Sequence, residues 1–175
     1  MKVFLIGMPG AGKSTLGPEL AAHLNYSFSD LDIEIEKAAG LPIPEIFAKR
    51  GEAGFRQLEA EALKTVANSA ENLVVATGGG TPCYSDNLAY MHTCGITVYL
   101  KAEPKVLEKR LFATDLKNRP LLKEKSSAQL LTYLEQTLQL RLPFYQQAGI
   151  IFEASQPANA VGQLADFIRQ FLQTA

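Results

Sequence analysis

Residues 7–15 read GMPGAGKST and match the pattern G-x-x-x-x-G-K-[ST] of a phosphate-binding loop. The apolar run Val3–Ile6 precedes this stretch as an expected strand, and Lys13–Leu24 follows it with the pattern of a helix. Glycines let successive backbone N–H groups turn towards one point at a helix N-terminus, where the helix dipole favours an anion. We therefore predict a nucleoside triphosphate site in which ATP is bound by Gly10, Ala11, Gly12, Lys13, Ser14 and Thr15.

Lys13 and Ser14 carry the charge and the metal ligand of this loop. An ammonium at this position neutralises the β- and γ-phosphates, and the hydroxyl that follows is a ligand for Mg²⁺. A glycine-rich turn without a ligand is the alternative, but the complete motif between a strand and a helix favours the nucleotide site. We expect Lys13 to be exposed at the anion site, so that its loss would leave the fold intact.

Short apolar runs alternate with helical patterns along the rest of the chain. Strands are also expected at 27–30, 73–76, 97–100 and 150–152, and helices at 33–39, 44–50, 52–69, 87–92, 104–111, 128–145 and 160–172. Apolar strands that alternate with helices predict an α/β fold of three layers, in which helices cover both faces of a five-stranded parallel sheet. The 175 residues show no internal repeat or linker, so we expect a single domain over residues 1–175.

The composition excludes several classes of protein. Lys plus Arg number 17 and Asp plus Glu number 18, so the net charge of −1 argues against binding of nucleic acid or membranes by bulk attraction. A hydrophobic fraction of 47% excludes an extended disordered chain. Cys83 and Cys94 have no metal spacing and are too few for a disulfide framework. With no signal peptide or long apolar run, these features predict a reduced, soluble protein of the cytoplasm.

Polar and small residues follow two of the predicted strands. Asp30 and Asp32 come at the end of the strand 27–30, and three consecutive glycines, 78–80, come after the strand 73–76. Ligands of parallel α/β sheets bind at this carboxyl edge, and glycines allow them to approach the backbone closely. Either aspartate also suits the N-cap of the following helix, and the local sequence does not decide between capping and ligand binding.

Six short segments together resemble the shikimate kinase family. They are GMPGAGKST, FSDLD, GFRQLE, ATGGG, NRPLL and RLPFY, and they occur in the family's order between Gly7 and Tyr145. The resemblance implies the P-loop fold of nucleoside monophosphate kinases, with a mobile lid at about residues 113–125. It also implies transfer of the γ-phosphoryl of ATP to the 3-hydroxyl of shikimate, with Mg²⁺, on the way to chorismate and the aromatic amino acids.

The same resemblance implies a role for each acceptor-side residue. Asp32 would bind the shikimate hydroxyls and act as the base or orienting group for the attacking oxygen. Arg56 and Arg141 would bind the carboxylate, and Gly79 would contact the ring hydroxyls through its backbone. A planar guanidinium can bind a carboxylate with two parallel hydrogen bonds, which makes arginine suitable for this task.

Three further residues are assigned to the nucleotide side by the resemblance. Asp30 would hold Mg²⁺ through water, next to Ser14. Arg119, in the lid, would bridge to the transferred phosphoryl and complete the catalytic set with Lys13 and Asp32. Gln156 stands where some members place an arginine against adenine, and its amide would contact the base edge. The segment 110–119 is longer than the family's usual approach to the lid, so Arg110 receives no adenine role.

Two other functions remain as alternatives at this level. One is a small-molecule kinase of the same fold that acts on a sugar acid or a nucleotide, which turnover on a substrate panel would reveal. The other is a non-enzymatic ATP-binding switch, against which Asp32 and Arg119 argue because a switch needs no acceptor site. The expected partners are ATP and shikimate, without nucleic acid or membrane, and the expected state is a monomer.

Overall fold

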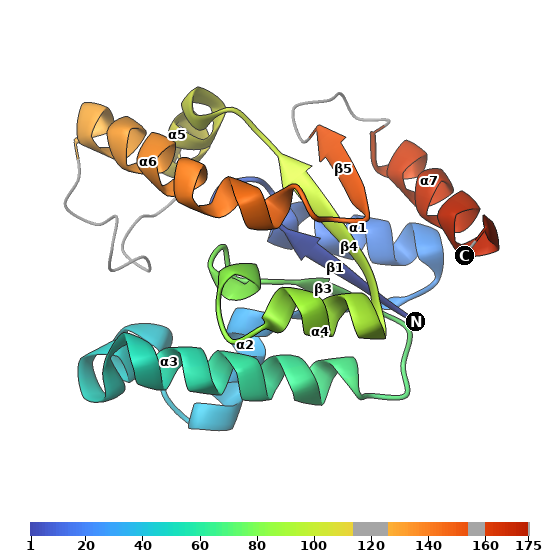
Figure 1. Cartoon of the computed structure of the whole chain (residues 1–175), viewed down its shortest axis with the longest axis horizontal. Helices are drawn as coiled ribbons and strands as arrows, with labels where there is room; N and C mark the ends of the chain where they lie inside the picture. The colour runs from blue at the N-terminus through green and yellow to red at the C-terminus, as the bar shows by residue number, and fades with distance from the viewer. Residues whose placement is uncertain (114–125, 154–159, 175) are drawn as a thin grey trace.

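A five-stranded parallel sheet forms the centre of the molecule in the computed structural model (Figure 1), which describes residues 1–113, 126–153 and 160–174. The strand order is β2-β3-β1-β4-β5. The strands are β1 (Lys2–Ile6), β2 (Ser27–Asp30), β3 (Leu73–Ala76), β4 (Gly95–Lys101) and β5 (Ile150–Glu153). The predicted parallel sheet of five strands is therefore confirmed.

Helices cover both faces of this sheet, as the alternating pattern predicts (Figure 1). They are α1 (Lys13–Leu24), α2 (Leu31–Ala39), α3 (Ile43–Ala67), α4 (Asn87–Cys94), α5 (Pro104–Ala113), α6 (Ser127–Tyr145) and α7 (Ala160–Thr174), with a 3₁₀ turn, η1 (Thr81–Cys83). The first crossover runs from β1 out to β2 and the later ones run the other way, so right-handed connections place α1 opposite α3, α4 and α6. The last helix, α7, packs against α1.

The central strand β1 determines where the site lies. All five of its residues are buried, and it pairs with β3 on one side and β4 on the other. The register aligns Leu5 with Ala76, so β1 and β3 end together. The loop 7–12 and the glycines 78–80 therefore begin one strand spacing apart, about 4.8 Å. No helix within the described residues is long and apolar enough to cross a bilayer.

Two element boundaries differ from the expectation for physical reasons. The helix α2 begins at Leu31 rather than at residue 33, because the Asp30 carboxylate caps it by accepting from the Asp32 N–H at 3.1 Å. The helices expected at 44–50 and 52–69 run on as α3, and the expected break between them is the kink at Gly51, where φ is 66° and ψ is −174°.

Candidate active site

The phosphate-binding loop joins β1 to α1, and its glycines supply the backbone angles that the turn needs. Gly10 has φ 81° and Gly12 has φ 99°, in the region that favours glycine. Lys13 is only 8% exposed, and its ammonium donates to the carbonyl oxygens of Gly7 at 2.7 Å and Met8 at 3.0 Å. The expectation of an exposed Lys13 is therefore wrong. The loop folds its own carbonyls around the cation, which leaves no unpaired buried charge.

Ser14 and Asp30 connect this loop to the second strand. The Ser14 hydroxyl donates to Asp30 Oδ2 at 2.6 Å, while Asp30 Oδ1 accepts from the Asp32 N–H. Asp30 therefore caps α2 with one oxygen and contacts the phosphate loop with the other. The capping interpretation is therefore confirmed for Asp30, and its role in ligand binding stays a prediction.

A cavity of about 630 Å³ lies over the phosphate loop. Its lining includes residues 9–16 together with Asp32, Gly79 and Arg110. Arg110 comes from α5 and donates from Nη1 to the Ala11 carbonyl at 3.3 Å. The cavity thus places the predicted nucleotide loop, the predicted acceptor carboxylate and the middle glycine of the triplet around one space.

The glycine triplet after β3 is where the other predicted residues meet. A Cβ at Gly79 would lie 2.9 Å from Arg141 Nη1 and 2.9 Å from Pro9 Cδ. A Cβ at Gly80 would lie 2.8 Å from Arg56 Nη2. Both contacts are shorter than a side chain tolerates, so these glycines make room for the two arginines rather than for an unusual backbone turn.

Gly78 completes the triplet on the side of the carboxylates. A Cβ there would lie 3.0 Å from Glu59 Oε1 and 3.4 Å from Asp32 Oδ1. Three successive glycines therefore bring the two arginines and the Asp32 carboxylate against one short backbone segment. That segment also contacts the phosphate loop through Pro9, so the predicted acceptor and nucleotide residues adjoin.

Carboxylates on both sides hold the Arg56 guanidinium. Its Nη1 donates to Glu59 Oε2 at 2.9 Å and its Nη2 donates to Glu52 Oε1 at 3.1 Å. Glu59 is 1% exposed and also accepts from the Thr81 hydroxyl at 2.6 Å, whereas Glu52 is largely exposed. Burial lowers the pKa of Arg56, but the two carboxylates outweigh burial and the net shift is upward. Arg56 therefore remains a cation.

Arg141 is held by the end of its own helix, α6. The buried Tyr145 hydroxyl is hydrogen-bonded to the Arg141 side chain and donates to the Gly79 carbonyl at 2.6 Å. The phenol also lies 3.7 Å from the Met8 sulfur, and its ring stacks on Tyr99 of β4. Burial raises the pKa of Tyr145 far above its usual range, so the hydroxyl remains a donor at all ordinary pH values.

Comparison with known proteins shows which family the chain belongs to. A family model described as shikimate kinase matches residues 9–174, which is nearly the whole chain. The chain belongs to the shikimate kinase family. It is 46% identical over 155 residues to a shikimate kinase from Phocaeicola vulgatus, covering 89% of this chain and 87% of that relative.

Solved structures of the shikimate kinase family share the fold over almost every residue. A crystal structure of shikimate kinase from Bacteroides thetaiotaomicron superposes with a TM-score of 0.89 at 40% identity, covering 99% of this chain and 98% of that one. Shikimate kinase from Acinetobacter baumannii, solved in complex with shikimate, gives a TM-score of 0.83 at 37% identity, with 99% and 93% covered.

Most residues that the shikimate kinase resemblance singled out lie around the cavity or the glycine triplet. Lys13, Ser14, Asp30 and Asp32 lie on the nucleotide side, and the two arginines lie against Gly79 and Gly80. Arg119 and Gln156 lie outside the described residues, as does nearly all of the expected lid, 113–125. Their assignments therefore stay predictions.

Two residues of the shikimate kinase motifs were missed as functional groups. Glu59 ends the segment GFRQLE and Tyr145 ends RLPFY, but each was passed over in favour of the arginine in the same segment. Their spacing carried the signal: Glu59 lies three residues after Arg56 and Tyr145 four after Arg141, so each pair shares one helix face. Phe55, next to Arg56, is buried and stacks on Phe47 with ring centroids 4.5 Å apart.

Proposed function

We propose that the protein catalyses transfer of the γ-phosphoryl group of ATP to the 3-hydroxyl of shikimate, which gives shikimate 3-phosphate and ADP. The observation that carries the proposal is the contact of the glycine triplet with two arginines, the Asp32 carboxylate and the phosphate loop. Phosphoryl transfer needs the donor and acceptor held in line with their charge neutralised, and this arrangement provides for both.

ATP fits the loop 7–15 because the backbone N–H groups and the N-terminus of α1 form an anion site with Lys13 at its base. Bound triphosphate offers the Lys13 ammonium a stronger partner than the carbonyls of Gly7 and Met8. In this proposal the ammonium keeps its place and adds the β- and γ-phosphate oxygens to its contacts.

Magnesium fits the oxygen donors beside the loop. The Ser14 hydroxyl and the Asp30 carboxylate, 2.6 Å apart, are hard oxygen ligands of the kind that Mg²⁺ prefers. No group of three or more His, Cys, Asp or Glu side chains among the described residues could hold a metal alone, so the ion would bind together with the nucleotide. When bound, it supplies charge neutralisation at the β- and γ-phosphates; Ser14 would ligate it directly and Asp30 through water.

Shikimate would lie between Asp32 and the two arginines. Arg56 and Arg141 are the cations at the glycine triplet, and a carboxylate bridging them would face away from Asp32. Asp32 lines the cavity with Lys13 and Ser14, so its carboxylate would accept the proton of the 3-hydroxyl or orient that oxygen towards the γ-phosphorus. The backbone of Gly79 would contact the ring hydroxyls.

The lid, 113–125, would close over the nucleotide and bring Arg119 to the transferred phosphoryl. Its contact would form mainly in the transition state, so Arg119→Ala should lower kcat far more than it raises the KM for ATP. Steady-state kinetics with both substrates varied separate this from ground-state binding, in which the KM for ATP would rise and kcat would remain. Gln156 would contact the adenine edge.

The proposal also covers the oligomeric state and the cellular location of the protein. We propose a monomer in the cytoplasm, because the residues assigned to the site all come from one chain and a net charge of −1 gives no bulk attraction to membranes. Size-exclusion chromatography with light scattering would test the monomer, and a dimer that loses activity on dilution would contradict it.

The experiment that tests the activity is coupled ADP release with Mg-ATP over a panel of shikimate, quinate, gluconate and AMP. Shikimate should give strong turnover and the other three little or none. Equal or greater turnover of gluconate or AMP would indicate that the protein is a kinase of another small molecule. Nucleotide binding without turnover of any acceptor would favour a switch.

A further inference from the structure

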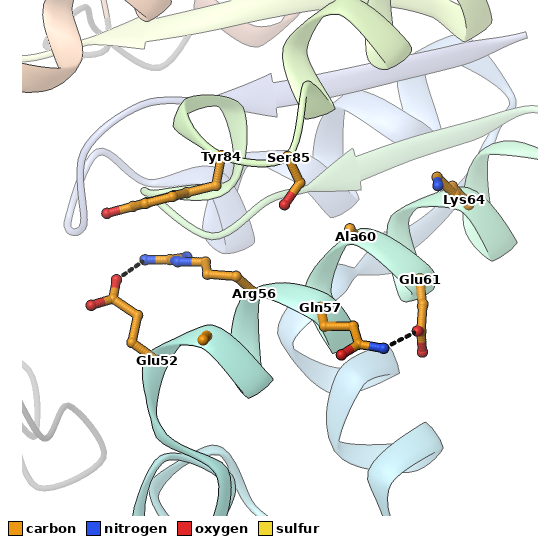
Figure 2. A pocket seen from close by; sticks show the side chains of 9 residues that line it. Glu52, Arg56, Gln57, Ala60, Glu61, Lys64, Tyr84 and Ser85 are labelled. Carbon is orange, nitrogen blue, oxygen red and sulfur yellow. Dashed lines mark hydrogen bonds and ion pairs between the residues drawn. The ribbon is translucent and has the colours of Figure 1, made fainter.

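Tyr84 follows the 3₁₀ turn η1 and places its ring on Arg56. The residue is 41% exposed, and the Arg56 Cζ lies 4.0 Å from the centre of its ring. Figure 2 shows the ring over the guanidinium, with Glu52 paired at the outer end of the arginine. The negative face of an aromatic ring attracts a cation at this distance. Tyr84 thus contacts the predicted carboxylate-binding arginine without lining the cavity over the phosphate loop.

The segment 80–84, which contains the turn η1, surrounds Arg56 in three ways. The Gly80 backbone before the turn lies against the guanidinium, and Thr81 within it binds Glu59, the buried partner of Arg56. The Tyr84 ring comes directly after the turn. Backbone hydrogen bonds from Cys83 to Gly80 at 2.8 Å and from Thr81 to Gly78 at 3.1 Å fix the turn itself. The guanidinium is therefore oriented by one rigid segment.

The backbone after Tyr84 is strained. Ser85 has φ 53° and Asp86 has φ 55°, two consecutive left-handed residues that are not glycine. Each such residue costs about 1–2 kcal/mol. This conformation reverses the chain immediately after the ring and leads it into α4, which begins at Asn87. Strain of this kind persists where the surrounding structure requires it, and here it accompanies the placement of the ring over α3.

We propose that Tyr84 is a positioning residue: its ring holds the Arg56 guanidinium in the orientation that binds the acceptor's carboxylate. The inference rests on the proposed function. The bond to the largely exposed Glu52 is weakened by solvent, so it holds the outer end of Arg56 poorly. A long arginine side chain loses much rotamer freedom when it binds, and a ring that orients it beforehand lowers that cost. Tyr84 therefore sets the affinity for acceptors that carry a carboxylate.

The test compares Tyr84→Ala and Tyr84→Phe with the wild type. Tyr84→Ala should raise the KM for shikimate about fivefold, within the range of cation–π energies, and leave the KM for ATP unchanged. Tyr84→Phe keeps the ring face and should restore most of the affinity. Phe171→Ala is the matched control, because it removes an equally exposed ring, 41%, from α7. The control should leave the KM for shikimate as it is.

The methyl ester of shikimate separates positioning from a general structural effect. If the ring acts through Arg56 on the carboxylate, wild type and Tyr84→Ala should use the uncharged ester with the same kcat/KM. If Tyr84→Ala lowers kcat/KM for the ester as much as it lowers kcat/KM for shikimate, this would overturn the proposal. So would an unchanged KM for shikimate in Tyr84→Ala, or a Phe variant as impaired as the Ala variant.

A measurement without an acceptor tests the positioning role of Tyr84 independently of the proposed function. The ring current of Tyr84 should shift the NMR signal of the Arg56 side-chain N–H in wild type and Tyr84→Phe but not in Tyr84→Ala. If the wild type fails to phosphorylate shikimate, the proposed function falls while this signal still reports on the ring. An Arg56 signal that is the same in all three proteins would overturn the positioning role whatever the acceptor.

Discussion

Two glycine-rich segments start side by side from β1 and β3, and they use glycine for different reasons. In the phosphate loop, Gly12 has φ 99° and a Cβ there would meet only Arg110 Nη1 at 4.0 Å. In the triplet, Gly79 has ordinary backbone angles, but a Cβ would collide with Arg141 and Pro9 at 2.9 Å. At Gly12 the loop needs only the freedom of the glycine backbone, whereas the triplet needs the missing side chain. Gly10 needs both, since a Cβ there would lie 3.0 Å from Leu111 Cγ.

In the proposed function, the difference follows from what each segment would bind. Kinases that act on different acceptors share the same triphosphate donor, and backbone N–H groups with one lysine suffice to bind it. The acceptor differs from one kinase to another, so its binding needs specific side chains from other elements, here α2, α3 and α6. The four predictions below concern the phosphate loop or the surroundings of the triplet, and they run from the largest expected effect to the smallest.

Lys13→Met should abolish most activity and also destabilise the fold. Loss of a charge that stabilises the transferring phosphoryl group costs about 10²–10³-fold in kcat. Because Lys13 is buried and donates to the Gly7 and Met8 carbonyls, its loss also removes these two hydrogen bonds, at about 1–3 kcal/mol. Activity assays and thermal melting without ligand measure the two effects.

Lys2→Met is the matched control for this prediction. Lys2 is equally buried, and its ammonium donates to the Ser69 and Glu71 carbonyls, far from the cavity. The control should lose stability and retain its kcat. Full stability of Lys13→Met would show that the carbonyl contacts add nothing to the fold.

Arg141→Lys should chiefly raise the KM for shikimate, by about tenfold. The charge remains, but the planar pair of donors is lost, which removes about 1–3 kcal/mol of charge-assisted bonding. Initial rates with shikimate varied at saturating ATP measure the change. An unchanged KM would mean that the carboxylate binds elsewhere, and a changed KM for ATP would remove the distinction between the two segments.

Gly79→Ala and Gly12→Ala test the two uses of glycine directly. At Gly79 the added methyl displaces Arg141 or Pro9, and overpacking of about 1–3 kcal/mol should appear in the KM for shikimate. At Gly12 the methyl meets a left-handed backbone and should cost about 1–2 kcal/mol in the free energy of unfolding.

Gly12→Asn sharpens this test, since asparagine tolerates left-handed angles better than alanine does. Denaturant unfolding of the ligand-free protein should therefore give a larger free energy of unfolding for Gly12→Asn than for Gly12→Ala. The opposite ranking would mean that space, rather than backbone conformation, limits the phosphate loop as well.

Tyr145→Phe should have the smallest effect at neutral pH and a clear one in alkali. Burial raises the folded pKa of Tyr145, so above about pH 10 the unfolded chain loses its proton first and stability falls as the pH rises. Tyr145→Phe should flatten this fall in the melting temperature. It should also raise the KM for shikimate about fivefold, since the hydrogen bond that orients the Arg141 guanidinium is lost and an intramolecular hydrogen bond typically contributes about 1 kcal/mol.

Tyr99→Phe controls for burial in this last experiment. Burial raises the pKa of Tyr99 too, and its ring stacks on Tyr145. It should flatten the alkaline fall without a change in the KM for shikimate. A KM that rises equally in both variants would assign the effect to the ring stack instead of the hydroxyl.

The sequence predicted the elements and motifs well because both are local. Apolar runs such as Val3–Ile6 and 73–76 became β1 and β3, and Asp30 and Asp32 follow β2 beside the phosphate loop as expected. Burial of polar groups was not predictable, because it depends on partners distant in the chain. Lys13 is buried by the carbonyls of its own loop, against expectation.

Contacts between remote segments were the other limit. The sequence places Arg56 and Arg141 in separate helices, and only the fold brings them against Gly80 and Gly79. The Tyr84 ring lies on Arg56 directly before two left-handed residues, Ser85 and Asp86, and local sequence does not predict two such residues in succession.

The direct pairing of β1 with β3 has a consequence for how such kinases diversify. Hydrogen bonds hold those strands at a fixed spacing, so the loops that carry Pro9 and Gly79 start from fixed points, and a Cβ at Gly79 would already lie 2.9 Å from Pro9 Cδ. Change must instead come from α3 and α6, whose residues can be replaced while the strands stay in place. Mutational libraries that seek new acceptors should therefore vary residues of those two helices. A lineage that changes its substrate should keep the residues at the strand ends and substitute those on the helix faces.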